Sequence, residues 1–327
     1  MRKLIFGCLV AINLASCIPL SVDPGFISPT ITPVETNTNI PGYSLGKIIY
    51  VTSDDSTNIF LSSPDASDPR LILSDIGIRS ASLAPDAKQV AYIIDDTIYI
   101  KNILDGQVRQ LSTQHISGFF TGMEWSPDSR WIGFDCIIEN ISEICIVNVE
   151  DGLLKILTDS KSFGAQLFDG AMFGSWNDDG SHIVYCLKVS GPQGGIPFTR
   201  FMLLSTIDNS SIQFMDDRSV PAITSYGCPK LSPFAPSILF VAKQDGKYGI
   251  FSADIDGHNV IRITSPVIKY DIHEPIIISP SGEYFFANSA KQDSDEIIDV
   301  PTLFSSEGQI VFQLDLPNAR VVSWVNE

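Results

Sequence analysis

A short unit recurs along this chain: an apolar residue, a Ser-Pro-Asp-like turn, and an aromatic residue seven positions after the proline position. In its clearest copy, Trp125 precedes the turn at Pro127 and Phe134 follows it. The proline position recurs at residues 85, 127, 178, 233 and 280, an interval of roughly 40 to 55 residues that is typical of repeated four-stranded sheets. The pattern therefore predicts an all-β repeat protein rather than one ordinary core.

Each repeat can be divided into four strands by its alternation of residue types and by its turns. The innermost strand ends at an apolar anchor, and the second strand ends at an aromatic residue. The third strand leads into a tight turn, such as Asp105-Gly106 or Glu307-Gly308, before a short outer strand. Large flat groups in these two columns suit a core between neighbouring sheets. The anchors are Leu83, Trp125, Trp176, Leu231 and Ile278.

The two ends of the repeat region complete each other. The first repeat begins at Gly46–Tyr50 without an innermost strand, while Arg320–Trp324 has the pattern of an innermost strand with no repeat after it. Pairing of these segments would close a ring and protect edge strands that could otherwise pair with other chains. We therefore predict a six-bladed β-propeller over residues 44–327, closed by pairing of the C-terminal strand with the N-terminal blade.

These repeats resemble a known family. Trp125–Ser129 followed by Phe134, the Ser279–Gly282 turn and the Asp-Gly outer turns are similar to the WD-like repeats of TolB-type six-bladed β-propellers. The resemblance covers residues 44–327, although the pattern is broken at Asn177–Gly180 and in the turn after Leu231. It implies the fold and a periplasmic or surface setting. We expect no counterpart of the additional N-terminal α/β domain of TolB, so the resemblance does not carry over the TolB role.

Residues 1–16 have the layout of a secretory signal peptide, with Arg2 and Lys3, an apolar stretch and then small residues. The apolar stretch is too short to span a bilayer as a stable helix. Small residues directly before Cys17 resemble the lipobox of bacterial lipoproteins, which implies cleavage before Cys17 and a lipid on its sulfur. A plain secretory signal with a coincidental cysteine is the alternative. Residues 17–43 are proline-rich and aperiodic, so we expect a lipidated, flexible tether there.

The charge balance limits the class of partner. The chain has 38 acidic and 21 basic residues, a formal net charge of -17 at pH 7. Such a surface repels nucleic acid and anionic lipid headgroups, so we expect no nucleic-acid partner and membrane attachment only through the N-terminal lipid. The charge is compatible with cationic partners, or with solubility alone.

Four cysteines fall in the repeat region, and export to an oxidising compartment would allow disulfides to persist there. Cys136 and Cys145 lie in consecutive strands of one hairpin, so a bridge between them is geometrically reasonable. A bridge between Cys186 and Cys228 would have to join neighbouring blades, and the sequence leaves that pairing open. No Cys/His cluster has zinc-ligand spacing, so we expect no metal site.

A partner-binding face is predicted where the connections between strands are long. The turns after the innermost and third strands are short, whereas the connections on the opposite face are long and irregular. Loops on a rigid scaffold commonly carry binding residues, although aromatic residues there could also tuck under their own loops. The candidates are Phe119, Phe120, Phe163, Phe168, Tyr226, Tyr270, His115 and His273.

We expect no catalytic site, because the chain has no Gly-rich phosphate loop and no HExxH sequence. Our first hypothesis is therefore a non-catalytic lipoprotein of the bacterial cell envelope, whose propeller is a scaffold that binds a protein or peptide with its long-loop face or its central funnel. A glycan-active lyase or hydrolase is the alternative, and it requires His115 and His273 to converge on the central axis with carboxylates. A sugar-binding or sensing module is the third hypothesis. We expect no cofactor.

Overall fold

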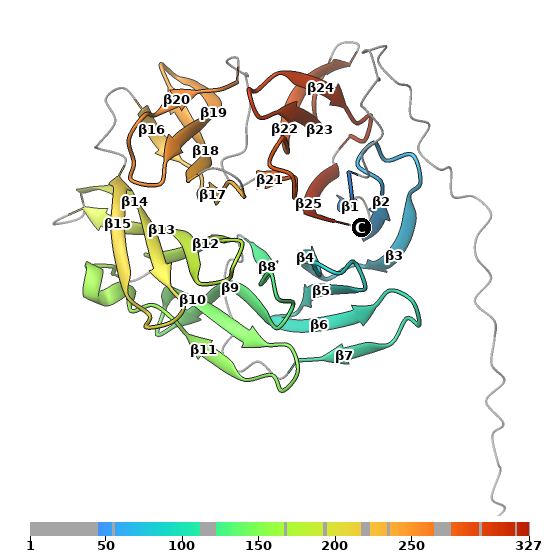
Figure 1. Cartoon of the computed structure of the whole chain (residues 1–327), viewed down its shortest axis with the longest axis horizontal. Coiled ribbons are helices and arrows are strands. Elements are labelled where there is room, and N and C mark those ends of the chain that lie inside the picture. The colour runs from blue at the N-terminus through green and yellow to red at the C-terminus, as the bar shows by residue number, and fades with distance from the viewer. Residues whose placement is uncertain are drawn as a thin grey trace, which may run out of the picture. The chain divides into compact units, whose positions relative to one another are not determined.

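The strands form antiparallel sheets that follow one another around a common centre (Figure 1). The computed structural model describes residues 45–53, 56–111, 122–166, 169–191, 195–216, 223–233, 236–264, 276–293, 296–317 and 319–326. All of these belong to one compact unit, Ile31–Glu327. The predicted signal peptide, Cys17 and most of the tether lie outside them. No helix in this described part is long and apolar enough to cross a membrane.

Most sheets contain strands that are consecutive in the sequence. The first sheet contains β1 (Lys47–Ser53), β2 (Thr57–Ser62), β3 (Arg70–Asp75) and β25 (Ala319–Val325). The second contains β4 (Ile78–Leu83), β5 (Gln89–Ile94), β6 (Thr97–Asn102) and β7 (Val108–Gln110). A later sheet contains β16 (Ile223–Tyr226), β17 (Lys230–Leu231), β18 (Ser237–Gln244), β19 (Lys247–Asp254) and β20 (Ile261–Arg262). The last sheet contains β21 (Ile277–Ile278), β22 (Tyr284–Asp293), β23 (Glu296–Ser305) and β24 (Ile310–Gln313).

Between these lies one continuous sheet that holds two repeats. It contains β8 (Met123–Trp125), β9 (Trp131–Ile138), β10 (Ile141–Asn148), β11 (Leu154–Ile156), β12 (Gly170–Trp176), β13 (His182–Gly191), β14 (Gly195–Ser205) and β15 (Ser211–Asp216). A single parallel pairing of Ser142 with Gly170 joins its halves. Gly170 has a φ of 129°, and a Cβ there would lie 2.2 Å from the Ser142 carbonyl oxygen, so only glycine fits. The all-β propeller prediction is confirmed, whereas the count of six separate blades stays a prediction.

The short turns of each repeat lie together on one face, which we name the turn face. A backbone N–H just after the third strand donates to a carbonyl just before the second strand. This bond recurs as Ile103 to Lys88, Val149 to Arg130, Thr206 to Ser181, Ile255 to Pro236 and Ser306 to Glu283. The opposite side, named the loop face, carries the hairpins between second and third strands and the connections between repeats. The repeated unit of the sequence is thus also a repeated hydrogen-bond pattern.

The core lies between neighbouring sheets, where the second-strand aromatic column is buried and the anchors are buried or half-buried. The second-strand aromatics Tyr50, Tyr92, Phe134, Tyr185 and Phe240 are all buried. Several of them stack on a ring of the third strand in their own sheet, as Phe240 does on Phe251. Phe240 also meets Phe201 of the preceding repeat edge to face, with ring centroids 5.2 Å apart. Aromatic contacts of this kind bind one sheet to the next.

The ring closes between its first and last strands, as predicted. β25 pairs antiparallel with β1, with Ile48 opposite Trp324 and Tyr50 opposite Val321 (Figure 1). The Trp324 ring is buried and lies 5.2 Å from the Phe286 ring of the preceding sheet. Its indole N–H donates to the Leu45 carbonyl. One side chain therefore binds the last strand both to the start of its own sheet and to the preceding sheet.

We expect Trp324→Ala to lower the free energy of unfolding by about 3–5 kcal/mol, because it leaves a large cavity at the closure. Trp324→Phe should cost less, since it keeps most of the packing and loses the indole hydrogen bond. Chemical denaturation followed by circular dichroism measures both. Trp131→Ala is the matched control, because Trp131 is half-buried and only packs at the edge of a core cluster. Equal losses at residues 324 and 131 would contradict the role of the closure.

Candidate functional site

A cavity of about 410 Å³ opens at the centre of the turn face. Its walls come from the ends of the innermost strands, so each repeat contributes the same three positions. The rim ring, two residues after each anchor, consists of Pro85, Pro127, Asp178, Pro233, Pro280 and Asn326. The inner ring, one residue before each anchor, consists of Ser82, Glu124, Ser175, Lys230, Ile277 and Ser323. The anchors themselves complete the lining.

The tryptophan anchors fix the wall of this cavity. The indole N–H of Trp125 donates to the Ser82 carbonyl at 3.1 Å, and that of Trp176 donates to the Glu124 carbonyl at 3.3 Å. Each indole therefore binds the inner-ring residue of the preceding repeat. Because both tryptophans are also buried between sheets, this part of the cavity wall consists of packed side chains held by main-chain contacts.

Two opposite charges neutralise each other in the inner ring. The Lys230 ammonium lies 3.0 Å from a Glu124 carboxylate oxygen, and it also donates to the Gly174 carbonyl. The other Glu124 oxygen accepts the Trp176 backbone N–H at 3.3 Å. This network joins β8, β12 and β17, which belong to three consecutive repeats. The inner ring is therefore polar, but its ion pair presents no net charge to a ligand.

The rim ring contains one charged side chain in the described part of the chain. Asp178 stands where four other repeats have proline, and no described group donates a hydrogen bond to its carboxylate. Burial raises the pKa of the Asp178 carboxyl, and the Asp179 carboxylate raises it further. Asp179 differs, because it accepts hydrogen bonds from Ser181 and Asn177, which lower its pKa. The carboxylate that faces the cavity is thus the one without a partner.

The structure places few of the predicted partner-face residues. Phe163 ends the short 3-10 helix Ser160–Phe163, where it is half-buried against a core cluster and its carbonyl accepts from Arg200 at 3.0 Å. Tyr226 is the last residue of β16. The rest of the predicted set lies outside the described residues: Phe119, Phe120, Phe168, Tyr270, His115 and His273. The loop face therefore stays a prediction.

The other histidines show no metal geometry. His182 shares a hydrogen bond with the Ser181 hydroxyl at 2.8 Å, and exposed His258 lies 3.0 Å from an Asp256 oxygen. Among the residues that the structure describes, no cluster of three His, Cys, Asp or Glu could hold a metal ion. No candidate cofactor or metal ligand set follows from these positions.

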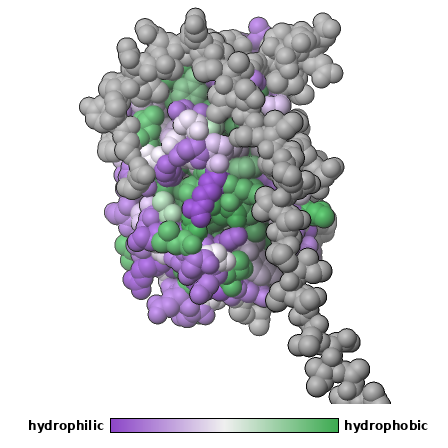
Figure 2. Space-filling view, turned by 90° about the vertical axis from the view of Figure 1, so that its right-hand side faces the viewer, coloured by the Kyte–Doolittle hydropathy of each residue, from purple (hydrophilic) through white to green (hydrophobic). Residues whose placement is uncertain are grey.

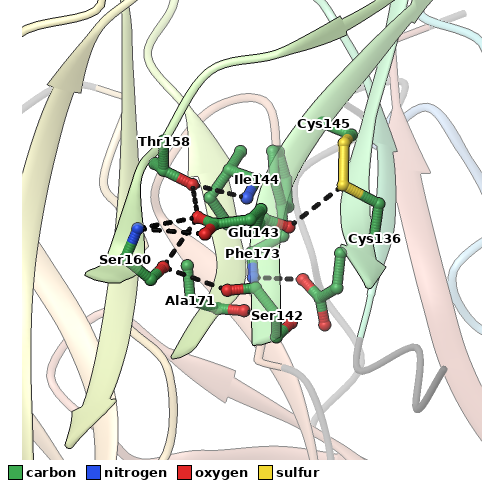
Figure 3. Close-up of a disulfide and its surroundings, with 10 residues drawn as sticks. Cys136, Ser142, Glu143, Ile144, Cys145, Thr158, Ser160, Ala171 and Phe173 are labelled. Atoms are coloured by element: carbon green, nitrogen blue, oxygen red, sulfur yellow. Dashed lines mark hydrogen bonds between the residues drawn. A yellow bond between two sulfur atoms is a disulfide. The ribbon is translucent and has the colours of Figure 1, made fainter. Parts of the chain in front are cut away.

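All four propeller cysteines are paired in disulfides. Cys136 of β9 is bonded to Cys145 of β10 within one hairpin (Figure 3). Cys186 of β13 is bonded to Cys228, in the segment between β16 and β17. The second bond joins two consecutive repeats, the pairing that the sequence left open.

Buried carboxylates join the halves of the eight-stranded sheet. Glu143, beside the first disulfide, accepts the Thr158 hydroxyl at 2.6 Å and the Ser160 backbone N–H at 3.0 Å (Figure 3). Burial raises the pKa of Glu143 despite these donors. The buried Asp135 carboxylate accepts the Phe173 backbone N–H of β12. These contacts satisfy backbone groups at the joint between repeats, so we assign the carboxylates a structural role.

Sequence reasoning offered a central funnel only as the alternative to the loop face, and it assigned none of the residues that line the cavity to a binding site. The repeats identified its anchors, but we expected binding on the opposite face because its loops are longer. A signal was present one residue before the anchors, where Glu124 and Lys230 stand at a position that is serine in three of the other repeats. Charged residues at an otherwise uncharged repeat position indicate that this position faces a polar space.

Comparisons with known proteins show the fold. No protein-family model and no curated protein matches the chain. The solved structure of TolB from Acinetobacter baumannii is similar, with a TM-score of 0.65 and 19% identity over 88% of this chain and 69% of that one. The structure of putative TolB from Agrobacterium tumefaciens has a TM-score of 0.59 and 15% identity, over 85% of this chain and 97% of that one. A chain of a nidogen/laminin complex has a TM-score of 0.57 and 9% identity, also over 85% of this chain and 97% of that one. The chain has a TolB-like β-propeller fold.

We expect Lys230→Met to lower the free energy of unfolding by about 1–2 kcal/mol, because it leaves the Glu124 carboxylate unpaired in a partly enclosed site. Adding Glu124→Gln should restore most of the loss, since no unpaired charge remains. Urea denaturation of the two variants tests this. Lys161→Met is the control, because its pair with Glu139 is exposed and should contribute nothing measurable. An additive double variant would contradict the coupling.

Proposed function

We propose that this protein is a non-catalytic cell-envelope lipoprotein whose propeller binds a protein or peptide partner at the central cavity. The observation that supports this most is the cavity itself, a rigid, mixed polar and apolar hollow at the centre of the turn face. The N-terminal segment supports the location, because it combines a signal-like stretch with a lipobox-like cysteine at residue 17.

Exposed aliphatic side chains on the turn face support a protein partner. Leu104 and Ile207 lie at equivalent turn positions and are 81% and 83% exposed. Leu71 of β3 is also exposed, at the outer edge of its sheet. Seen from the side, at 90° to the view of Figure 1, the molecule shows hydrophobic residues among hydrophilic ones (Figure 2). Mixed surfaces of this kind are common where proteins dock. The structurally similar nidogen/laminin complex is an assembly of proteins, in line with this use of the fold.

The glycan-active alternative depends on His115 and His273, which lie outside the described residues. No observation on the described ones favours it, and we do not propose it. A partner on the loop face remains the competing location within the same function, so a test should address both faces.

A photo-crosslinking amino acid at Leu104 should capture a partner in the native envelope, whereas the same group at Ile76 should not. Ile76 is the matched control because it is equally exposed, at 84%, but lies in the β3–β4 connection on the loop face. Crosslinked products that form from one site and not from the other are detected by immunoblotting after irradiation, and the captured partner is identified by mass spectrometry. Capture only from residue 76 would move the site to the loop face. Capture from neither residue would contradict the scaffold role.

Cys17→Ser should release the protein from membranes, because a lipid on this cysteine is the proposed anchor. Phase partition in detergent and labelling with a fatty-acid analogue measure the loss. Cys8→Ser, inside the apolar stretch, should leave both readouts unchanged. A labelled or membrane-bound Cys17→Ser variant would overturn lipid anchoring and favour a plain secretory signal.

A further inference from the structure

The rim ring departs from proline at Asp178 and at Asn326, and of these two residues Asp178 adds a charge. Pro85, Pro127, Pro233 and Pro280 present apolar rings at the mouth, whereas Asp178 presents a carboxylate. The Asn177–Gly180 turn keeps the geometry of the other turns, since the Gly180 N–H bonds the Asn177 carbonyl just as the Ser129 N–H bonds that of Ser126. The aspartate is therefore not needed to form the turn.

The Asp178 carboxylate also forms no hydrogen bond or ion pair with another described residue. Its neighbour Asp179 receives the donors of the turn, from Ser181 and Asn177. The cation of the cavity, Lys230, is neutralised by Glu124 at 3.0 Å. Among the described lining residues, Asp178 is thus the one charged group whose charge is not balanced by another lining group.

The rest of the lining suits an apolar group. Leu83, Leu231 and Ile278 contribute aliphatic surface, and the tryptophan anchors add their ring edges. Their indole N–H groups are occupied by backbone carbonyls, so the rings offer mainly apolar contact. An apolar group inside the cavity would bring its immediate neighbour to the rim, where the carboxylate lies.

We propose that the cavity recognises an apolar side chain together with an adjacent ammonium or guanidinium group, as in a protein segment where an aliphatic residue precedes lysine or arginine. The apolar side chain enters the cavity, and the cation pairs with the Asp178 carboxylate at the rim. This rests on the proposed function and names the chemistry of its partner. The net charge of -17 would favour the approach of such a segment.

The tryptophans provide reporters for a direct test. The chain has four of them, of which Trp125, Trp176 and Trp324 line the cavity and Trp131 does not. The full-length protein in detergent, labelled with 5-fluorotryptophan, would be titrated with acetyl-Leu-Lys-amide, acetyl-Leu-Gln-amide and acetyl-Leu-Glu-amide and followed by fluorine NMR. Tryptophan-to-phenylalanine variants assign the signals. We expect the three cavity signals to shift and that of Trp131 to stay in place.

The lysine peptide should bind about three- to fivefold more tightly than the glutamine peptide, the range for one exposed ion pair, and the glutamate peptide most weakly. Asp178→Asn should remove the preference for lysine, whereas Asp179→Asn should retain it. The preference should also fall with added salt and with protonation of Asp178 at low pH.

Equal affinity for the three peptides, or a preference that survives Asp178→Asn, would overturn the cation proposal while leaving the cavity as a docking site. Peptides that shift none of the cavity signals would overturn both the cation proposal and the location of the proposed function. An unchanged Trp131 signal in each variant shows that the fold is intact.

Discussion

The face-to-face packing of neighbouring sheets is the interaction on which the rest of the structure depends. A four-stranded sheet of this length cannot bury both of its faces alone, so each repeat relies on the next for its core. The contact of Phe201 with Phe240 shows this across one joint. A ring has no free end only if its first and last sheets also meet. β25 joins the first sheet by pairing with β1, and its Trp324 ring contacts Phe286 of the last sheet. Stability is therefore cooperative around the circle.

The same packing produces the candidate site. Because each innermost strand must place its anchor between sheets, the residues on either side of that anchor are directed to the central axis. The site is consequently built from residues far apart in the sequence, such as Glu124 and Lys230, without any loop that is specialised for binding. A scaffold of this kind can change its specificity by substitution at one ring position, and Asp178 is such a substitution.

Much of the fold could be predicted from the sequence because the repeat is a physical requirement: each sheet needs an anchor, a turn and an aromatic residue at fixed offsets. The closure by Trp324 could be predicted for the same reason, because the first repeat lacks an innermost strand and the C-terminal segment has the pattern of one. The residues of the site were not predicted, because the length of the loops favoured the opposite face over the central funnel. The predicted loop-face residues lie mostly outside the described part of the chain. The Cys186–Cys228 pair also escaped prediction, since sequence spacing carries no information on which residues of consecutive repeats face each other.

That interrepeat disulfide changes what a break in the chain can do. After a single cleavage anywhere between residues 186 and 228, the Cys186–Cys228 disulfide would keep the two products covalently attached. The pairing of β1 with β25 would also hold their terminal strands together. In an environment with proteases, the molecule could thus tolerate a nick in this region, and loss of the assembled ring would require a second event. Resistance of this kind is kinetic, and it is independent of how much free energy the bridge contributes.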